Sequence, residues 1–423
     1  MSEGGLYASL YGDAGMAAIL SDAATLSAML RVETALAEAQ AGLGMIPTAD
    51  AQAIAEAAAT LRPETDTLRA EVSRAGIAAQ PLIAALKRAA GVAGGAVHLG
   101  ATSQDITDSA LALQLTEALA LLEGRLAALD ATLAAKATTY SDQPIPARTR
   151  HQIAAPTTLG AKIAVWRGMA TRNRARLAEL RPRVLRLALH GAAGTSASFG
   201  GHGPALRAAV AEALGLAVPD GPWHAARDGM AELAGWLSLV TGGLGKMGLD
   251  LIQLGQSELG EVTAGRGGGS SAMPQKSNPV AAEALVTLAR LNAGDLAGMH
   301  HALIHAQERD GSALGLEWTL LPQMLTRTAA SLRLAQGLAE TLTPDPARIA
   351  ATFAADRGRM TAEAAGHLLS RTLPRAEAQR LVAEALARVG ADPTLTLAAA
   401  LDALAPGTDW THELDPARLA GSD

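Results

Sequence analysis

The feature that most constrains the fold is an unbroken run of apolar residues spaced three and four apart. It occupies the stretch from Arg227 to Val262, at Met230, Leu233, Leu237, Val240, Leu244, Met247, Leu251 and Leu254. This spacing lines up the side chains on one side of an α-helix that packs lengthwise against other helices. At 1.5 Å per residue such a helix runs ~50 Å. The segment therefore predicts a long bundle helix, and its glycines predict that neighbouring helices approach closely: Gly235, Gly242, Gly243, Gly245, Gly248 and Gly255.

Two further segments carry the same pattern. One has Leu115, Leu119, Leu122, Leu126, Leu129 and Leu133, and the other has Leu285, Leu288, Asn292, Leu296, Met299 and Leu303. Only 2% of the residues are aromatic against 49% hydrophobic, too few aromatics for a β-sandwich or barrel. We predict an all-α fold with helical domains at 1–100, 101–342 and 343–423, the long helices being in the second. Apolar seams on several helices favour an oligomer over three unrelated helices in a monomer.

Composition also excludes several classes of protein. The chain has no cysteine, which excludes a disulfide framework, a Cys-ligated metal and a thiol nucleophile. A net charge of −6 is not the basic balance expected of a nucleic-acid binder. No uncharged apolar run is long enough to span a membrane, and the first residues do not resemble a signal peptide. We therefore expect a cytoplasmic protein that binds neither nucleic acid nor membrane.

The loop richest in chemical groups runs from Gly265 to Pro279. Three successive glycines give it a mobile backbone, and Ser270, Lys276 and Asn278 follow them. Backbone N–H groups, an ammonium and hydroxyls are what a lid closing on an anion needs. A plain linker would not require Lys276 and Asn278 beside the serines, so the loop predicts a functional site.

Two other polar loops leave alternatives open. Thr102 and Ser103 precede a long helix, where their hydroxyls suit either capping or carboxylate binding, whereas Asp105 is better explained as a cap. A further loop holds Arg148, Arg150, His151 and Gln152, which suit bidentate recognition of a carboxylate, although composition alone favours an ordinary solvated surface.

Two histidine-containing segments invite other interpretations. His301 and His305 lie four residues apart with Glu308 one turn on, but the glutamate that a zinc-protease helix needs after its first histidine is missing. We expect no metal and no organic cofactor. Trp223 and His224 fit a packing corner and the edge of a site equally well.

Two segments together resemble the fumarase/aspartase superfamily: Gly269-Ser-Ser-Ala-Met-Pro-Gln-Lys-Ser-Asn-Pro279 and His98-Leu-Gly-Ala-Thr-Ser-Gln-Asp105. The resemblance implies five-helix bundles that assemble into the twenty-helix core of a homotetramer, with each active site built from three subunits. It also implies that Ser270 is the catalytic base and that Lys276 acts beside it on a substrate carboxylate. The residues that it implies for substrate binding are His98, Thr102, Ser103, Asn278 and Arg309.

One departure from the motifs of this superfamily reduces the number of activities that fit the chain. Where most lyases of this superfamily have Arg-Thr-His-x-Gln, with the histidine as general acid, this chain has Arg148-Thr-Arg-His-Gln152. A departing carboxylate needs no general acid, because its conjugate acid has a pKa of about 4. The chain thus resembles the branch that cyclises a carboxymuconate to a lactone, a small tricarboxylate for which Arg148, Arg150 and Gln152 would be binding groups. The same branch is resembled in three other segments: Pro222-Trp-His-Ala-Ala-Arg-Asp228, Glu317-Trp-Thr-Leu-Leu-Pro322 and Arg357-Gly-Arg-Met-Thr-Ala-Glu363.

Two rival functions are also compatible with the sequence. An aminosuccinate-type lyase that releases fumarate, such as adenylosuccinate lyase, would use His151 as its acid. A non-catalytic tetrameric scaffold would not need Ser270, Lys276 and Asn278. Whether His98, His151 or His224 assists proton transfer is left open.

Overall fold

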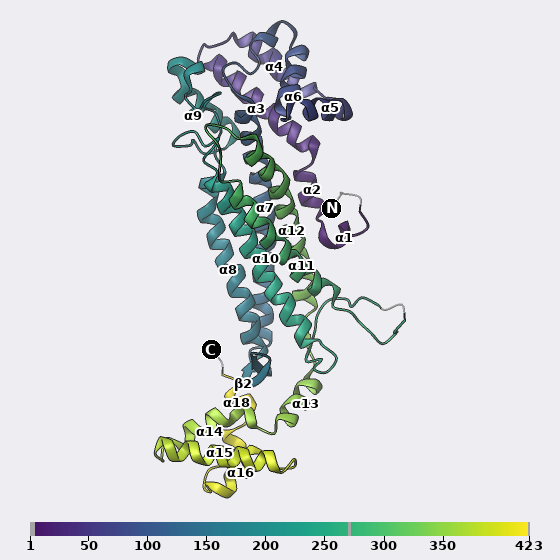
Figure 1. Cartoon of the computed structure of the whole chain (residues 1–423), viewed down its shortest axis with the longest axis vertical. Coiled ribbons are helices and arrows are strands. Elements are labelled where there is room, and N and C mark those ends of the chain that lie inside the picture. The colour runs from purple at the N-terminus through teal and green to yellow at the C-terminus, as the bar shows by residue number, and fades with distance from the viewer. Residues whose placement is uncertain (1–4, 270–271, 422–423) are drawn as a thin grey trace. The chain divides into compact units, whose positions relative to one another are not determined.

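A computed structural model describes residues 5–269 and 272–421. The α-helices, drawn in Figure 1, are α1 (Ala8–Tyr11), α2 (Ala14–Ile19), α3 (Asp22–Gly42), α4 (Thr48–Thr60), α5 (Thr65–Ala75), α6 (Ala79–Ala89), α7 (Ser103–Thr139), α8 (Leu159–Val184), α9 (Gly203–Leu214), α10 (Asp228–Leu254), α11 (Val280–His301), α12 (Gly311–Thr341), α13 (Pro346–Asp356), α14 (Ala362–Leu369), α15 (Arg375–Ala391), α16 (Leu397–Leu404), α17 (Trp410–Glu413) and α18 (Pro416–Leu419). Short 3₁₀ helices are η1 (Gly91–Gly95), η2 (Ala197–His202) and η3 (Arg359–Thr361). The strands are β1 (Pro144–Thr149), β2 (Gln152–Thr158), β3 (Val262–Thr263) and β4 (Thr343–Pro344).

The all-α prediction is confirmed. Five helices, α7, α8, α10, α11 and α12, have between 22 and 37 residues each. The described strands form only two antiparallel pairs, β1 with β2 and β3 with β4.

The chain divides into two compact units. Unit 1 comprises Met1–Arg125, Arg172–Gly242 and Thr287–Leu332, and unit 2 comprises Leu126–Thr171, Gly243–Val286 and Arg333–Asp423. Each unit contains part of all five long helices. The three domains expected from the sequence follow other boundaries and stay a prediction.

The predicted seams on α7 and α10 lie in the interior, whereas in the third seam Leu296 and Leu303 are only partly buried and Leu303 lies beyond the end of α11 at His301. All eight apolar seam residues of α10 are buried, as are the six leucines of the α7 seam. The predicted end of α10 was wrong. We expected a helix within the stretch up to Val262, whereas α10 ends at Leu254. Gly260 there adopts a left-handed φ of 59°, and Val262 pairs with Pro344 in the β3–β4 ladder.

The glycines of α10 divide into two kinds. A Cβ on Gly248 would lie 2.6 Å from the Ala282 carbonyl oxygen of α11, so this glycine permits a close helix contact. Gly235 and Gly242, by contrast, have no described atom within 4 Å of a Cβ position apart from the neighbouring backbone of their own helix. Close packing within one chain therefore explains Gly248 but neither of these two.

In unit 1, the N-terminal helices form the support of the site. Helices α3, α4, α6 and α9 share one apolar core, and they are drawn together at the top of Figure 1. Leu36, Ile54, Leu82 and Val210 are among its buried members. The chain leaves this core through η1 and reaches the start of α7 at Ser103.

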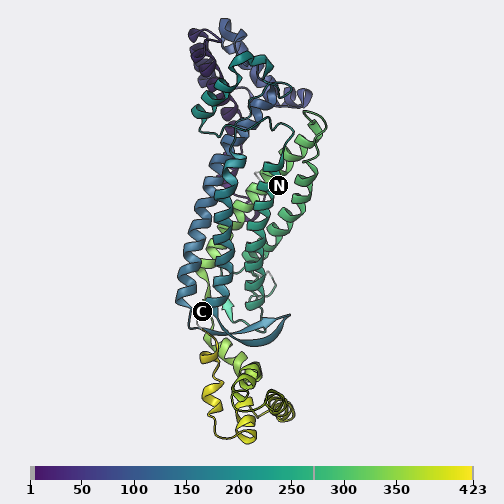
Figure 2. The same ribbon diagram turned by 90° about the vertical axis from the view of Figure 1, so that its left-hand side faces the viewer.

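In unit 2, a β-hairpin precedes α8 and projects from its helices in Figure 2. Its two-residue turn consists of Arg150 and His151, with φ angles of 49° and 66°. Two positive φ angles match a type I′ turn, which usually takes asparagine and glycine. The hairpin therefore holds two non-glycine residues in an unfavourable backbone conformation at its tip.

Candidate active site

Left-handed backbone conformations gather in the polar loops. The non-glycine residues with positive φ in the part of the chain that the structure describes are His98, Arg150, His151, Ser196, Gln307 and Arg357. His98 and Arg150 are candidate site residues, His151 follows Arg150, and Gln307 lies two positions before Arg309. Arg357 has a structural explanation, because its Nη1 donates to the carbonyls of Val389 and Asp392. Such strain persists where other interactions hold it, and it is common at functional sites.

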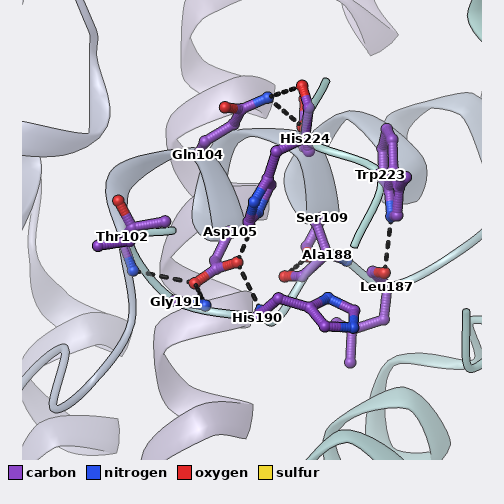
Figure 3. Close-up of polar contacts among 12 residues, drawn as sticks. Thr102, Gln104, Asp105, Ser109, Leu187, Ala188, His190, Gly191, Trp223 and His224 are labelled. Atoms are coloured by element: carbon purple, nitrogen blue, oxygen red, sulfur yellow. Dashed lines mark hydrogen bonds and ion pairs between the residues drawn. The ribbon is translucent and has the colours of Figure 1, made fainter. Parts of the chain in front are cut away.

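Asp105 organises the first candidate segment (Figure 3). Its fully buried carboxylate accepts hydrogen bonds from the backbone N–H of Thr102 at 2.9 Å, His190 at 2.9 Å and Gly191 at 3.0 Å. A fourth comes from the His224 ring, whose Nε2 lies 2.8 Å from Asp105 Oδ1. The bond to Thr102 is half of a capping box at the start of α7, so the capping interpretation of Asp105 is confirmed. The same carboxylate also joins the loops at 98–102 and 190–194.

His224 and Trp223 are both buried beside this network. His224 contacts Asp105, and Trp223 Nε1 donates to the Leu187 carbonyl oxygen at 2.9 Å. Both side chains therefore take part in packing, and His224 also holds the Asp105 carboxylate in place.

His98 has a carboxylate partner of its own. Its Nδ1 lies 2.7 Å from Oε1 of Glu33, a buried residue of α3. This contact fixes the orientation of the His98 ring. The Nε2 atom of His98 has no hydrogen-bond partner among the described residues and is free to interact with a ligand.

Thr102 and Arg309 are brought together in unit 1. Arg309 Nη2 donates to Thr102 Oγ1 at 3.0 Å and to the Ala192 carbonyl oxygen at 3.2 Å. Arg309 Nε donates to Oε1 of Gln104, also at 3.0 Å. Ser103 lies between Thr102 and Gln104 as the first residue of α7. A carboxylate could therefore bind here, because the N-terminus of this long helix lies beside a hydroxyl and a guanidinium.

Behind these residues lies a buried charge cluster. The Arg227 guanidinium bonds Asp108 at 2.7 and 3.1 Å and Glu317 at 2.8 and 2.6 Å. All three side chains are buried. Burial lowers the pKa of Arg227, but the two carboxylates outweigh it and raise that pKa above its usual value. Two of the segments that resemble the lactone-forming branch therefore meet here, one through Arg227 and the other through Glu317.

His190 is a buried histidine that the sequence analysis did not single out. Its Nδ1 has no partner within the described residues, and its ring lies 6.4 Å from that of His224. Burial lowers its pKa to about 4, with further lowering by Arg207 and His224 and a smaller opposing effect of Asp105. His190 is therefore neutral at pH 7. Its position directly before Gly191 in a polar loop was the signal available in the sequence.

This histidine makes stability depend on pH. An unfolded histidine has a pKa near 6.5, so between pH 6.5 and about 4 the unfolded chain binds more protons than the native one. We expect the neutral, buried His190 to make its full contribution to the free energy of unfolding above pH 6.5. As the pH falls towards 4 this contribution should be lost, which lowers the free energy of unfolding by an amount on the order of 2 kcal/mol. Urea unfolding of wild type and His190→Gln at pH 7 and 4.5 checks this. The difference between the two proteins should change by that amount, whereas His300→Gln, on an exposed residue of α11, should behave like wild type. Parallel pH profiles for wild type and His190→Gln would contradict it.

In unit 2, the candidate arginines of the hairpin differ from each other. Arg148 forms a bidentate ion pair with the buried Glu261, at 2.7 and 2.6 Å. Arg150 and Gln152 are exposed and have no side-chain partner among the described residues. Beside the ion pair lies Lys162, whose pKa is lowered first by burial and then by Arg148. Arg148 thus anchors the hairpin, while Arg150 remains available to a ligand.

The loop at 265–279 is closed at its base. Gly268 and Asn278 exchange two backbone hydrogen bonds of 2.8 Å. A Cβ on Gly267 would lie 1.5 Å from Ser277 Oγ, and one on Gly268 would lie 2.5 Å from Val280 Cγ2. Close approach therefore explains two of the three successive glycines. The Lys276 side chain is exposed, and Ser270 lies outside the described residues.

The histidines considered for metal binding do not form a ligand set. Neither ring nitrogen of His305 has a partner in residues 5–269 and 272–421, and burial followed by the Arg227 charge lowers its pKa. In those residues no group of three His, Asp or Glu side chains is arranged to hold a metal ion. Nor does any described helix combine the length and apolar character that a membrane crossing requires.

The candidate residues form two sets. Unit 1 holds His98, Thr102, Ser103 and Arg309, and unit 2 holds Arg148, Arg150, Gln152, Lys276 and Asn278. Gln104 is a further residue of this region that was not expected from the sequence, although it lies inside the His98–Asp105 segment. The feature that could have indicated it is a polar residue on the buried side of the first turn of a helix.

The comparisons with known proteins decide the family. The sequence profile of the lyase family matches residues 13–292. The chain belongs to this family. A 3-carboxy-cis,cis-muconate cycloisomerase of Pseudomonas aeruginosa is 42% identical over 424 residues, which cover 96% of this chain and 92% of the relative. A nitrosuccinate lyase of Streptomyces davaonensis is 35% identical, over 96% of this chain and 90% of that protein.

A solved structure agrees with this lyase assignment. The crystal structure of 3-carboxy-cis,cis-muconate lactonizing enzyme from Pseudomonas putida superposes with a TM-score of 0.92 at 38% identity, covering 98% of this chain and 96% of that one. The resemblance to the fumarase/aspartase superfamily is therefore confirmed, and this lyase-family chain is an enzyme.

Proposed function

We propose that the enzyme cyclises 3-carboxy-cis,cis-muconate to a carboxymuconolactone, with the cytoplasm as its location. The observation that supports this proposal most strongly is which of the enzyme's cationic side chains are paired with carboxylates. Arg148 and Arg227 are neutralised by carboxylates, whereas Arg150, Lys276 and Arg309 have no carboxylate partner among the described residues. Three unpaired cations among the candidate residues match a substrate with three carboxylates. The names of the cycloisomerase relatives from two Pseudomonas species support the same substrate.

The reaction balances without a cofactor. One substrate carboxylate oxygen forms a C–O bond to a carbon of its own double bond. The π electrons move onto the carboxylate next to the other carbon, giving an aci-carboxylate. Ser270 then delivers its proton to that carbon and regains one from solvent. Lys276 and Asn278 stabilise the doubled negative charge, and Arg150 and Arg309 hold other carboxylates.

Arg150 fits this chemistry better than a histidine acid would. In the reverse reaction the leaving group is a carboxylate, which departs without a proton at neutral pH. A guanidinium at the hairpin tip can orient a carboxylate but cannot act as an acid, since guanidinium groups in proteins do not release their protons. An aminosuccinate lyase, by contrast, must protonate a departing amine.

The assay that tests the function follows ultraviolet absorbance of the purified protein with each substrate. We expect 3-carboxy-cis,cis-muconate to lose its conjugated-diene absorbance, because ring closure removes one double bond. Adenylosuccinate should remain unchanged. Turnover of adenylosuccinate with no effect on the muconate would overturn the proposal.

We further propose that the enzyme is a homotetramer whose subunits share active sites. Gly235, Leu239 and Gly242 lie at helical spacing on α10, both glycines face open space, and Leu239 is 53% exposed. In the same unit, Leu291 of α11 and Trp318 of α12 are also exposed. Burial of such apolar faces against other copies is what stabilises a helical oligomer. Light scattering should give four times the chain mass of 43.0 kDa.

Shared sites predict that Ser270→Ala, which lowers kcat, and Arg309→Met, which raises KM, restore each other when activity is assayed at a substrate concentration near the wild-type KM. When Ser270→Ala chains and Arg309→Met chains are refolded together in equal amounts, sites that draw the two residues from different subunits regain both. Random mixing should restore about one quarter of wild-type activity. Each variant refolded alone is the control. A mixture no more active than the separate variants would contradict sharing between these two residues.

A further inference from the structure

Gln104 occupies an unusual place at the start of α7. Its side chain is fully buried, and Nε2 donates to Asp108 Oδ2 at 2.9 Å and to the His224 carbonyl oxygen at 2.8 Å. Both of these partners can only accept. The amide therefore has one possible orientation, with Oε1 directed at Arg309 Nε, 3.0 Å away.

Arg309 is held without being neutralised. Its three partners, Gln104 Oε1, Thr102 Oγ1 and the Ala192 carbonyl oxygen, are all uncharged. Its Nη1 has no partner within the described residues, and the residue is exposed. The guanidinium thus keeps its charge and one free nitrogen for an anion. Thr102 Oγ1 accepts from Arg309, so its own proton is free to point at the same anion.

The other end of Gln104 rests on a fixed anchor. Asp108 Oδ2, which accepts from Gln104, also accepts from Arg227 Nη1 at 2.7 Å. Two carboxylates against one guanidinium leave the cluster of Asp108, Glu317 and Arg227 with an excess negative charge. The amide dipole of Gln104 lies between this cluster at its nitrogen end and Arg309 at its oxygen end, which favours both contacts.

We propose that Gln104 is a positioning residue that transmits the rigidity of the buried Asp108–Arg227–Glu317 cluster to Arg309 and so aims Arg309 and Thr102 at one substrate carboxylate. The proposal rests on the proposed function for the identity of that substrate. Gln104 touches no substrate itself and acts through Arg309. A glutamate at this position would direct a carboxylate at Asp108 and at the His224 carbonyl, so the amide is required.

A double-mutant cycle tests this. Gln104→Met should raise KM about tenfold, the value of one hydrogen bond to a charged group, with kcat within about threefold of wild type. Arg309→Met should raise KM about a hundredfold. If Gln104 acts through Arg309, the double variant should match Arg309→Met within about twofold. Multiplication of the two effects, or an unchanged KM in Gln104→Met, would overturn the proposal.

Two further measurements keep the test decisive. Gln104→Asn retains an amide for Asp108 but is one methylene too short for Arg309, so it should show the KM of Gln104→Met with a smaller loss of thermal stability. Calorimetric binding of tricarballylate, an unreactive tricarboxylate, should show the same non-additive cycle. If wild type lacks turnover but the tricarballylate cycle holds, the proposed function fails and the role of Gln104 stands. Additive losses of tricarballylate affinity overturn the role of Gln104 whatever the turnover.

Discussion

Ser270→Ala is expected to lower kcat by a factor of about 10² to 10⁴, the usual contribution of a general acid–base residue. In the lactonising direction this serine delivers the proton to carbon, and no other hydroxyl in the loop is assigned that role. KM should stay within about threefold of wild type, because the substrate carboxylates are held by Lys276, Asn278 and the arginines. Steady-state kinetics with the muconate substrate measures both quantities.

The neighbouring serine provides the matched control. Ser271→Ala removes an identical hydroxyl from the next position in the chain and should leave kcat within about threefold of wild type. Near-normal turnover in Ser270→Ala, or an equal loss in both variants, would contradict the assignment of the base to Ser270.

Arg227→Met should destabilise the protein by about 3 to 5 kcal/mol. The substitution leaves the Asp108 and Glu317 carboxylates buried beside each other with no counter-charge. It also removes the guanidinium that lies 4.7 Å from the ring centre of Trp223. The mutual repulsion of two buried carboxylates adds to the loss. Urea unfolding of the variant and of wild type at pH 7 measures it.

A surface arginine gives the comparison. Arg183 makes a bidentate pair with Glu232 on residues that are about half exposed, so Arg183→Met should cost less than about 1 kcal/mol. Similar losses for Arg183→Met and Arg227→Met would show that burial of the charge cluster is not what makes Arg227 important.

Periodicity made the scaffold predictable. The three-and-four spacing on α7 and α10 follows directly from helix geometry, so the buried seams were identified residue by residue. The end of α10 was not predicted correctly. Apolar spacing does not indicate the left-handed turn at Gly260 or the pairing of β3 with β4 across about eighty residues. The two-residue turn at Arg150 and His151 was also missed, since neither residue favours a positive φ.

The types of residue in the site could be predicted from the sequence better than their hydrogen-bond and ion-pair partners. Thr102 and Arg309 followed from a family resemblance, but nothing local tells that Arg309 reaches Gln104 across 205 positions. Likewise, Arg148 and Arg150 look alike in sequence, and only the fold separates the one that Glu261 neutralises from the one left free. Such pairings depend on tertiary contacts, which spacing alone does not encode.

The most direct test of the proposed reaction is the mass of the product formed in D₂O from 3-carboxy-cis,cis-muconate. Cyclisation with proton delivery to carbon leaves the elemental composition unchanged in H₂O and adds one non-exchangeable deuterium in D₂O. We predict a lactone with the mass of the substrate in the first case and one unit more in the second. Recovery of unchanged, unlabelled muconate, together with release of fumarate from an aminosuccinate, would contradict the account.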